Sequence, residues 1–352
     1  MTPLAEKLGR QIRATGPMTV ADYMRACLLD PDLGYYTGRD PLGAAGDFTT
    51  APEISQMFGE LLGLSLAQAW LDQGAPAPFL LAELGPGRGS LMADVLRATR
   101  AVPGFHDAMR LSLVEASPVL RAEQARRLDR FRPAWFDNLA DLPDGPLFLL
   151  ANEFFDALPV RQFVADGAGW RERMLTVVDG GLAFALAPPA PLPAPPDVAP
   201  VSGILETCAP AEALAGDIGA RLAADGGAAI IVDYGGWHSD GDTLQSVSAH
   251  EKTGPLAMPG QADLTAHVAF GALARAAAAA GAAHGPLVAQ GTFLERLGIV
   301  ARARQLAAGL AEPALSAHVA AHRRLTHPQE MGQLFQGLAI HAGSAAPPPG
   351  FT

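Results

Sequence analysis

Short apolar runs alternate with helix-like segments along most of this 352-residue chain. The runs are short enough and apolar enough to be buried strands, and they fall at 79–84, 111–114, 147–151 and 228–233. Segments with apolar residues at helical spacing lie at 90–100, 117–130 and 210–224. Because this alternation is typical of a doubly wound sheet with helices on both faces, the sequence predicts an α/β fold around a mostly parallel sheet.

Changes in this pattern divide the chain into four expected parts. A helical N-terminal extension with a glycine-punctuated loop is expected over 1–75, and the first part of the core over 76–159. An antiparallel insertion is expected over 160–205, and the rest of the core, with added helices, over 206–345. The insertion is predicted because an alternation typical of antiparallel strands begins after Pro159. The rest of the core is expected to add three helices and a last strand, at 263–280, 291–309, 313–325 and 334–340.

The composition excludes several classes of protein. A formal net charge of −11 argues against a nucleic-acid-binding protein, because such a protein needs a basic face to neutralise phosphates. The two cysteines, Cys27 and Cys208, are too few for a disulfide framework or a zinc cluster, so we expect no metal site and a reducing compartment such as the bacterial cytoplasm. No apolar stretch reaches the ~18–20 residues of a membrane span, so we expect no membrane insertion.

A glycine-rich motif stands between the expected strand 79–84 and the helix that follows it. It reads Glu-Leu-Gly-Pro-Gly-Arg-Gly over 83–89, and its glycines let the backbone pass close to a ligand and turn sharply into the helix. The next strand ends in Glu115, 26 residues after the last glycine, where an acid can accept hydrogen bonds from both hydroxyls of a ribose. These residues predict a cofactor that is lined by three glycines: Gly85, Gly87 and Gly89.

Two cofactors are compatible with this arrangement. A dinucleotide site needs a third glycine where this chain has Ser90, and the carboxylate of Glu83 would repel a pyrophosphate. The same carboxylate suits the ammonium or the sulfonium of S-adenosylmethionine, which is therefore the expected cofactor, with Glu83 and Asn152 among its binding residues. A nicotinamide-dependent oxidoreductase is the alternative, as is a glycine-rich turn that only packs a helix onto the sheet.

Acidic residues follow the strand at 147–151. Ligand-facing residues of open α/β sheets come from the carboxyl ends of the strands, so we expect Glu153 and Asp156 at the mouth of the cofactor cleft. A second acidic segment over 46–56 contributes Asp47.

Paired carboxylates of this kind are suited to a guanidinium as the methyl acceptor. A guanidinium is always protonated in water, and carboxylates match its fork of N–H groups while one of them accepts the proton as the new bond forms. We therefore expect Glu153 as the main catalytic acid, assisted by Asp47 or Asp156. Taken singly, Glu53 and Asp156 are explained equally well as helix caps or surface charges.

These segments together resemble the MidA family of methyltransferases, which assist the assembly of respiratory complex I. The resemblance runs over nearly the whole chain in the family's order, at 46–60, 83–90, 114–118, 152–159, 206–208, 233–235, 242–245 and 263–268. Two positions depart from the family pattern. Ala269 stands where an acidic residue is usual, and Ser90 replaces a common threonine.

The resemblance implies a class I methyltransferase (Rossmann-like) core that uses S-adenosylmethionine. It also implies a protein substrate, with methylation of an arginine in the quinone-proximal 49-kDa-type subunit of complex I, in the mitochondrial matrix if the protein is eukaryotic. The alternative is a non-catalytic assembly factor that retains the fold. A protein that has lost its catalytic activity does not need to keep Glu153 and Asp47 together with an intact glycine loop. Their presence in this chain therefore favours an enzyme.

Overall fold

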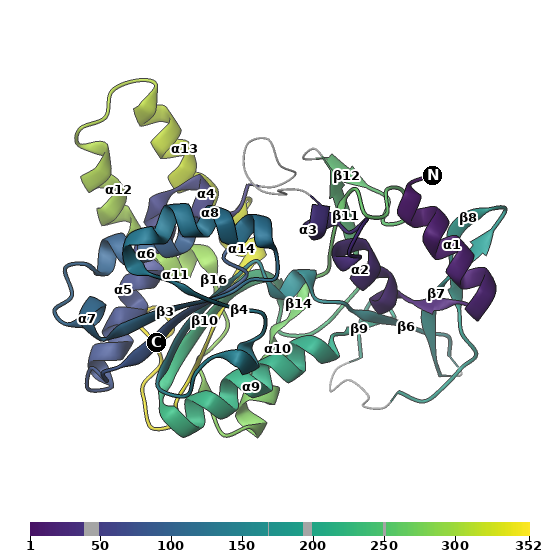
Figure 1. The fold of residues 1–352 in the computed structure, drawn as a ribbon, viewed down its shortest axis with the longest axis horizontal. Helices are drawn as coiled ribbons and strands as arrows, with labels where there is room; N and C mark the ends of the chain where they lie inside the picture. The colour runs from purple at the N-terminus through teal and green to yellow at the C-terminus, as the bar shows by residue number, and fades with distance from the viewer. Residues whose placement is uncertain (39–48, 168, 193–198, 249–250) are drawn as a thin grey trace. The chain divides into compact units, whose positions relative to one another are not determined.

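The computed structural model describes the chain except for residues 39–48, 168, 193–198 and 249–250. The chain divides into two compact units, each built from three stretches of sequence (Figure 1). Unit 1 comprises Met1–Phe48, Phe155–Ala211 and Gly236–Ala269. Unit 2 comprises Thr49–Phe154, Glu212–Gly235 and Phe270–Thr352. Each unit therefore combines parts of several of the segments expected from the sequence.

A mostly parallel sheet forms the centre of unit 2. Its strands follow the order β17, β10, β5, β2, β3 and β4, and the short strands β15 and β16 pair with β17. Their bounds are β2 Phe79–Leu84, β3 Met109–Val114, β4 Ala134–Phe136, β5 Leu147–Asn152, β10 Gly227–Gly236, β15 Ala283–His284, β16 Val288–Ala289 and β17 Phe335–His341. The strands from β10 to β4 pair in parallel, while β17 is antiparallel to β10, so the predicted α/β fold is confirmed.

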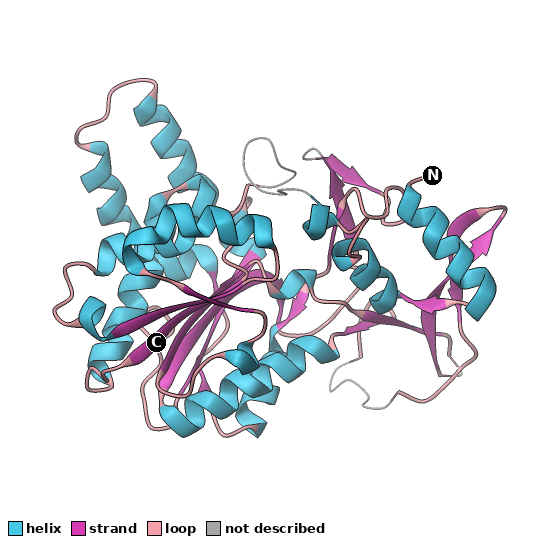
Figure 2. Cartoon of the chain, viewed as in Figure 1, coloured by secondary structure: helices cyan, strands magenta, loops and turns pink. Residues whose placement is uncertain are grey.

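Helices cover both faces of this sheet (Figure 2). They are α4 Ala51–Ile54, α5 Gln56–Asp72, α6 Ser90–Thr99, α7 Phe105–Ala108, α8 Pro118–Leu128, α9 Ala209–Asp225, α10 Phe270–Ala279, α11 Gln290–Arg296 and α14 Met331–Leu334, with the short 3-10 turns Asp129–Phe131 and Leu139–Asp141. All six residues of β2 are buried, as expected for a strand covered on two faces. Gly63 allows α5 and α6 to pack closely, because a Cβ there would lie 2.9 Å from Val95 Cα.

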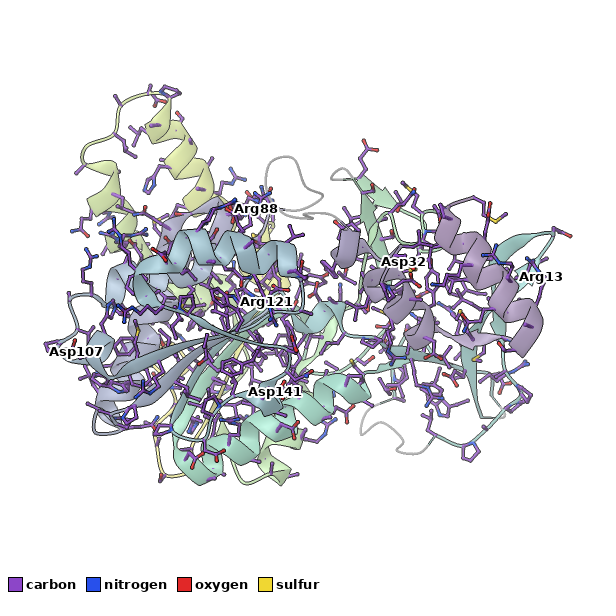
Figure 3. All side chains as sticks on the ribbon, in the orientation of Figure 1. Arg13, Asp32, Arg88, Asp107, Arg121 and Asp141 are labelled. Carbon is purple, nitrogen blue, oxygen red and sulfur yellow. The ribbon has the colours of Figure 1, made fainter. Side chains whose placement is uncertain are left out.

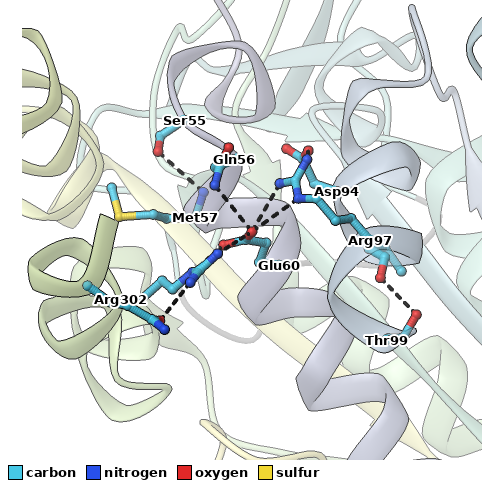
Figure 4. Close-up of polar contacts among 10 residues, drawn as sticks. Ser55, Gln56, Met57, Glu60, Asp94, Arg97, Thr99 and Arg302 are labelled. Carbon is cyan, nitrogen blue, oxygen red and sulfur yellow. Dashed lines mark hydrogen bonds and ion pairs between the residues drawn. The ribbon is translucent and has the colours of Figure 1, made fainter. Parts of the chain in front are cut away.

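The helices α12 (Ile299–Ala307) and α13 (Ala314–Thr326) form a hairpin that projects from the rest of unit 2 (Figure 1). None of residues 300–324, all of which the structure describes, is buried. The base of the hairpin is held by Glu60 on α5, whose buried carboxylate accepts hydrogen bonds from Arg302 at 2.7 and 2.8 Å and from Arg97 at 3.1 Å (Figure 4). The hairpin is thus attached to α5 at its base through the ion pair of Glu60 with Arg302, and residues 300–324 are partly or fully exposed.

Two of the helices expected in the last third of the chain are corrected by the structure. The helix expected at 263–280 begins only at Phe270, because Asp263–Thr265 forms a strand, β13. The helix expected at 291–309 is two helices, α11 and α12, which are separated at Gly298; its φ of +88° is the left-handed conformation typical of helix ends. The helix at 313–325 and the last strand are confirmed as α13 and β17.

Unit 1 contains two antiparallel sheets. In the first, β6 (Arg161–Ala165), β7 (Trp170–Val178) and β8 (Gly181–Leu186) pair with each other, which confirms the antiparallel pairing expected within 160–205. Two further strands, β9 Ile204–Thr207 and β1 Met18–Thr19, add to the edges of this sheet. The second sheet consists of β13 with two strands that the sequence did not indicate, β11 Gln245–Ser248 and β12 Glu251–Thr253.

The helices of unit 1 pack apolar faces into a core of their own. They are α1 Pro3–Thr15, α2 Val20–Leu29 and α3 Tyr35–Gly38. The 3-10 turn Phe155–Ala157 belongs to the second stretch of sequence in this unit. Leu4, Leu8 and Ile12 lie on one face of α1 at helical spacing and are all buried. The N-terminal segment expected over 1–75 is therefore divided, because α1, α2 and α3 belong to unit 1 whereas α4 and α5 belong to unit 2.

Candidate functional site

The glycine-rich motif forms the loop between β2 and α6, as predicted. Gly85, Gly87 and Gly89 have φ values of +59°, +54° and +76°, in the left-handed region that side chains rarely adopt. A Cβ on Gly85 would come within 2.8 Å of the ring of Phe154. The N–H of Gly85 donates to the carbonyl of Val114 at 3.0 Å, and this bond ties the loop to the end of β3.

Glu83, near the end of β2, is a buried acid beside this loop. Its side chain is 3% exposed, and its Oε2 atom has no hydrogen-bond partner among the residues that the structure describes. Burial, and then the nearby carboxylate of Glu115, raise the pKa of Glu83 to about 8. A buried acceptor without a partner is costly, so this atom is suited to a donor or a cation from a ligand.

Glu115 directly follows β3 and is held by the start of the next helix. Its Oε1 accepts a hydrogen bond from the N–H of Ser117 at 2.8 Å, and its Oε2 accepts one from Nε2 of Gln124 at 3.3 Å. Burial raises the pKa of Glu115, against the opposite effect of these two bonds. The chain thus supplies hydrogen bonds to both oxygens of this carboxylate.

The pair Asn152 and Glu153 ends β5. Asn152 Nδ2 donates to Glu153 Oε1 at 3.0 Å, whereas its own buried Oδ1 meets no donor within the described chain. Glu153 has a φ of +50°, an unusual value for a residue with a side chain, and such backbone strain clusters at functional sites. The N–H of Glu153 donates to the carbonyl of Val232 at 2.9 Å, and its Oε1 also accepts from the N–H of Ala51 at 3.1 Å.

A buried aspartate on the neighbouring strand β10 fixes the backbone after Glu153. Asp233 is fully buried; its Oδ2 accepts a hydrogen bond from the N–H of Phe154 at 3.2 Å and its Oδ1 accepts one from the N–H of Tyr234 at 2.9 Å. The sequence signal for this role is a carboxylate at the end of an apolar run. Asp233 therefore fixes the backbone of Phe154. The ring of Phe154 fills the space that a Cβ on Gly85 would need.

Two other acids, Asp47 and Asp156, are expected at the acceptor site. Asp47 lies outside the described residues. Asp156 belongs to unit 1, where it is 7% exposed and its carbonyl accepts from the N–H of Ala266 at 3.0 Å. Tyr36 donates to Asp263 Oδ1 at 3.0 Å, and burial together with the charges of Asp263 and Asp156 raises the pKa of Tyr36 well above its usual range.

Several polar contacts around the glycine loop were not predicted from the sequence. Ser90, the first residue of α6, donates to Glu53 Oε1 and accepts from Arg127, so Glu53 is bound to the loop rather than being a free surface charge. Arg121, labelled in Figure 3, donates to the carbonyl of Glu115 at 2.6 Å and to that of Phe136 at 3.1 Å. The bonds of Ser90 join residues that are 37 apart in sequence, and for this reason local patterns do not reveal them.

The residues at this edge of the sheet fit S-adenosylmethionine. Glu83, Glu115 and Asn152 lie at the carboxyl ends of β2, β3 and β5, three adjacent strands, where ligands of open α/β sheets bind. Their oxygens are acceptors, and the cofactor offers an ammonium, a sulfonium and two ribose hydroxyls. Within the described ranges, no group of His, Cys, Asp or Glu side chains is arranged to hold a metal ion, and no helix is long and apolar enough to span a membrane.

Comparison with known proteins gives the same result. A family model for S-adenosyl-L-methionine-dependent methyltransferases matches residues 61–287. The chain is 38% identical to the mouse (Mus musculus) mitochondrial protein arginine methyltransferase NDUFAF7, over 98% of this chain and 87% of that protein. It is 37% identical to the Drosophila melanogaster homologue, over 97% of this chain and 86% of that protein.

A solved structure extends the comparison to the fold. A methyltransferase from Burkholderia thailandensis, bound to S-adenosylhomocysteine, is 29% identical, with a TM-score of 0.84, and the match covers 99% of this chain and 94% of that one. The resemblance stated from the motifs is confirmed by these matches. The chain therefore belongs to this family of S-adenosyl-L-methionine-dependent methyltransferases.

Proposed function

We propose that this methyltransferase transfers its methyl group to an arginine of a protein substrate, a subunit of respiratory complex I of the 49-kDa type, during assembly of that complex. The observation that carries the proposal is Glu153. It lies at the carboxyl end of β5 beside Asn152, with a strained backbone and a carboxylate oxygen already oriented by two N–H donors. The names of the similar proteins support arginine as the acceptor.

The cofactor half of the proposal assigns each residue a role. S-adenosylmethionine supplies the electrophilic methyl group. Glu83 binds its ammonium, Glu115 accepts hydrogen bonds from its ribose, and Asn152 supplies a further acceptor. The left-handed backbone at Gly85, Gly87 and Gly89 allows the loop to approach the cofactor without side chains.

The acceptor half depends on charge and orientation. Methyl transfer from a sulfonium is an in-line displacement, so the protein has to point one guanidinium nitrogen at the methyl group. Glu153 binds the guanidinium through charge-assisted hydrogen bonds and takes up the proton that the nitrogen loses. Asp47 and Asp156 are assigned the assisting role that the sequence predicts for them. A bacterial enzyme of this kind would act in the cytoplasm, and a eukaryotic one in the mitochondrial matrix.

The test is direct identification of the methylated residue. Purified enzyme, isotopically labelled S-adenosylmethionine and the isolated complex I subunit are incubated, and the products are mapped by mass spectrometry. The same map is made for complex I from cells with and without the gene. Label on one arginine, absent in the deletion strain, supports the proposal. Label on a lysine or a glutamine, or an unchanged map in the deletion strain, contradicts it.

A further inference from the structure

Gln124 on α8 is a fully buried amide in a position that favours an apolar residue. It lies between Leu120 and Leu128 at i, i+4 and i+8, on the helix face that is buried against the rest of unit 2. Burying an amide is costly unless its hydrogen bonds are made, and an unbranched apolar side chain of the same length would fill the space. The presence of glutamine therefore needs an explanation beyond packing.

Three hydrogen bonds fix the orientation of this amide. Trp135 Nε1 donates to Gln124 Oε1 at 2.8 Å. Gln124 Nε2 donates to the carbonyl of Gly87 at 2.8 Å and to Glu115 Oε2 at 3.3 Å. Because an indole N–H is only a donor, it must face the amide oxygen, and the amide N–H groups are left for the other two partners. One side chain therefore joins β4, the glycine loop and the acid after β3.

The bond to Gly87 controls the orientation of a peptide group in the loop. The peptide between Gly87 and Arg88 is planar, so its carbonyl and its N–H point in opposite directions. Since Gln124 holds the carbonyl on the side of α8, the N–H of Arg88 points to the other side. The bond thereby restricts rotation about the Cα–C bond of Gly87, a residue whose φ of +54° already lies in the left-handed region.

The bond to Glu115 acts on the carboxylate that we assign to the ribose. Ser117 donates to Oε1 and Gln124 donates to Oε2, and a carboxylate with protein donors on both oxygens retains acceptor capacity for a ligand hydroxyl. The same bond favours the ionised carboxylate, against the effect of burial, which raises its pKa. Gln124 thus helps to orient this acceptor and favours its ionised form.

We propose that Gln124 is a positioning residue for the cofactor, which couples the glycine loop to Glu115 so that recognition of the ribose hydroxyls depends on it. This inference rests on the cofactor half of the proposed function and deepens it. Gln124 itself needs no contact with the cofactor in this role. Its effect is transmitted through the Gly87 carbonyl and the Glu115 carboxylate.

The experiment compares how strongly the ribose hydroxyls matter in each variant. Calorimetry measures the affinity of S-adenosylhomocysteine and of analogues that lack the 2′- or the 3′-hydroxyl. Loss of a hydroxyl that is bound to a carboxylate should weaken binding by the wild-type protein by roughly ten- to a hundredfold. In Gln124→Met, binding of the intact compound should weaken by roughly tenfold. The hydroxyl penalty, which is the loss of affinity when one ribose hydroxyl is removed, should shrink to less than about threefold.

A matched control separates positioning from burial. Gln290 in unit 2 is also fully buried and donates to the carbonyl of Leu325 at 2.9 Å, on α13. Gln290→Met removes a buried amide of the same kind and should leave the hydroxyl penalty at its wild-type value.

The pH dependence of the hydroxyl penalty gives a second readout. In Gln124→Met, any remaining penalty should disappear at a higher pH than in the wild-type protein, because a bond that holds down the pKa of Glu115 is lost.

A third variant distinguishes failure of this inference from failure of the site assignment. If Glu115→Gln keeps the full hydroxyl penalty, the ribose assignment itself is wrong. If Glu115→Gln removes the penalty and Gln124→Met retains it, only the role of Gln124 is overturned. Should Gln124→Met not fold, as judged by circular dichroism, Trp135→Phe carries the test. It removes the indole N–H that orients the amide but keeps an aromatic ring at this position, and it must reduce the penalty for the inference to stand.

Discussion

Glu153 Oε1 accepts a hydrogen bond from the backbone N–H of Ala51 at 3.1 Å, across 102 residues of chain. Ala51 is the first residue of α4, so this N–H is one of those that a helix leaves without a partner of its own. The acid at the end of β5 is therefore bound to Ala51, within the acidic segment 46–56. Glu153 therefore has a structural hydrogen bond in addition to its proposed role in binding the acceptor. A substitution that removes its charge but keeps its shape tests the second role without losing the first.

Glu153→Gln should lower the rate of arginine methylation by at least about a hundredfold, the lower range for loss of a general base. Cofactor affinity should stay within about twofold of wild type, because the amide oxygen still accepts the Ala51 N–H and the cofactor residues are untouched. Calorimetry and a methylation assay measure the two quantities separately. The control is Glu330→Gln, which removes one member of an exposed ion pair with Arg323 and should change neither.

Substitutions of Gly87 separate backbone strain from loss of space for the cofactor. Gly87→Val places a β-branched residue at a φ of +54° and should cost about 1–3 kcal/mol of unfolding free energy. Gly87→Asn should cost less, since asparagine tolerates the left-handed region. If the side chain intrudes on the cofactor, both variants lose binding in calorimetry while thermal unfolding distinguishes them. Binding that survives in both would remove Gly87 from the cofactor site.

The raised pKa of Glu83 predicts a pH dependence of stability without ligand. Its pKa rises from 4.5 to about 8 on folding, so the folded protein holds a proton that the unfolded chain releases in this range. The unfolding free energy should therefore fall, by a few kcal/mol at about 1.4 kcal/mol per pH unit, as the pH rises from about 4.5 to 8. Denaturant unfolding at several pH values measures this slope. Glu83→Gln should flatten it.

The same group predicts proton release when the cofactor binds. Below pH 8, the carboxyl of Glu83 is largely protonated in the ligand-free protein, and a cation placed beside it favours the ionised form. Binding of S-adenosylmethionine at pH 7 should therefore release close to one proton, which calorimetry in buffers of different ionisation enthalpy detects. Glu83→Gln should weaken binding and abolish this release. An unchanged proton count in that variant would assign the release to another group.

The ion pair at the base of the α12–α13 hairpin predicts local unfolding. Burial alone would raise the pKa of Glu60, yet hydrogen bonds from Arg302 and Arg97 hold it below its usual value. This stabilisation is therefore fully present above the usual pKa of a glutamate and is lost as the pH falls through the lowered pKa of Glu60. Arg302→Met should destabilise the protein by about 1–3 kcal/mol, less than for a fully buried pair, because the Arg302 side chain is 30% exposed. Hydrogen exchange should accelerate in α12 and α13, with the strands of unit 2 unchanged. Uniform acceleration would contradict a local role.

The glycine loop was predictable because its signals are local. The apolar run of β2, the glycines that follow it and the acid after β3 each stand within a few residues of the element they end or begin. A pattern read along a short window captures such features directly. The α/β fold followed from the same kind of repeated local signal.

The features that escaped prediction depend on distant partners. The segment 263–265 was expected to begin a helix, but it pairs with β11, and the hydroxyl of Tyr36 donates to Asp263, 227 residues away. Short strands of this kind are set by their neighbours rather than by their own composition. Gln124 and Asp233 had only a weak signal, a polar residue within an apolar stripe or run, which does not reveal the group to which it bonds.

The interleaving of the two units has a consequence for synthesis of the protein. The chain passes from one unit to the other after residues 48, 154, 211, 235 and 269, so neither unit is a continuous stretch. Domains that are continuous fold in turn as they leave the ribosome. Here β10 obtains its partner β17 only when residues 335–341 have been made, which leaves an apolar strand edge exposed until then. Nascent chains of this protein are therefore expected to need a chaperone until β17 has been made, and a pause in translation before β17 should promote their aggregation.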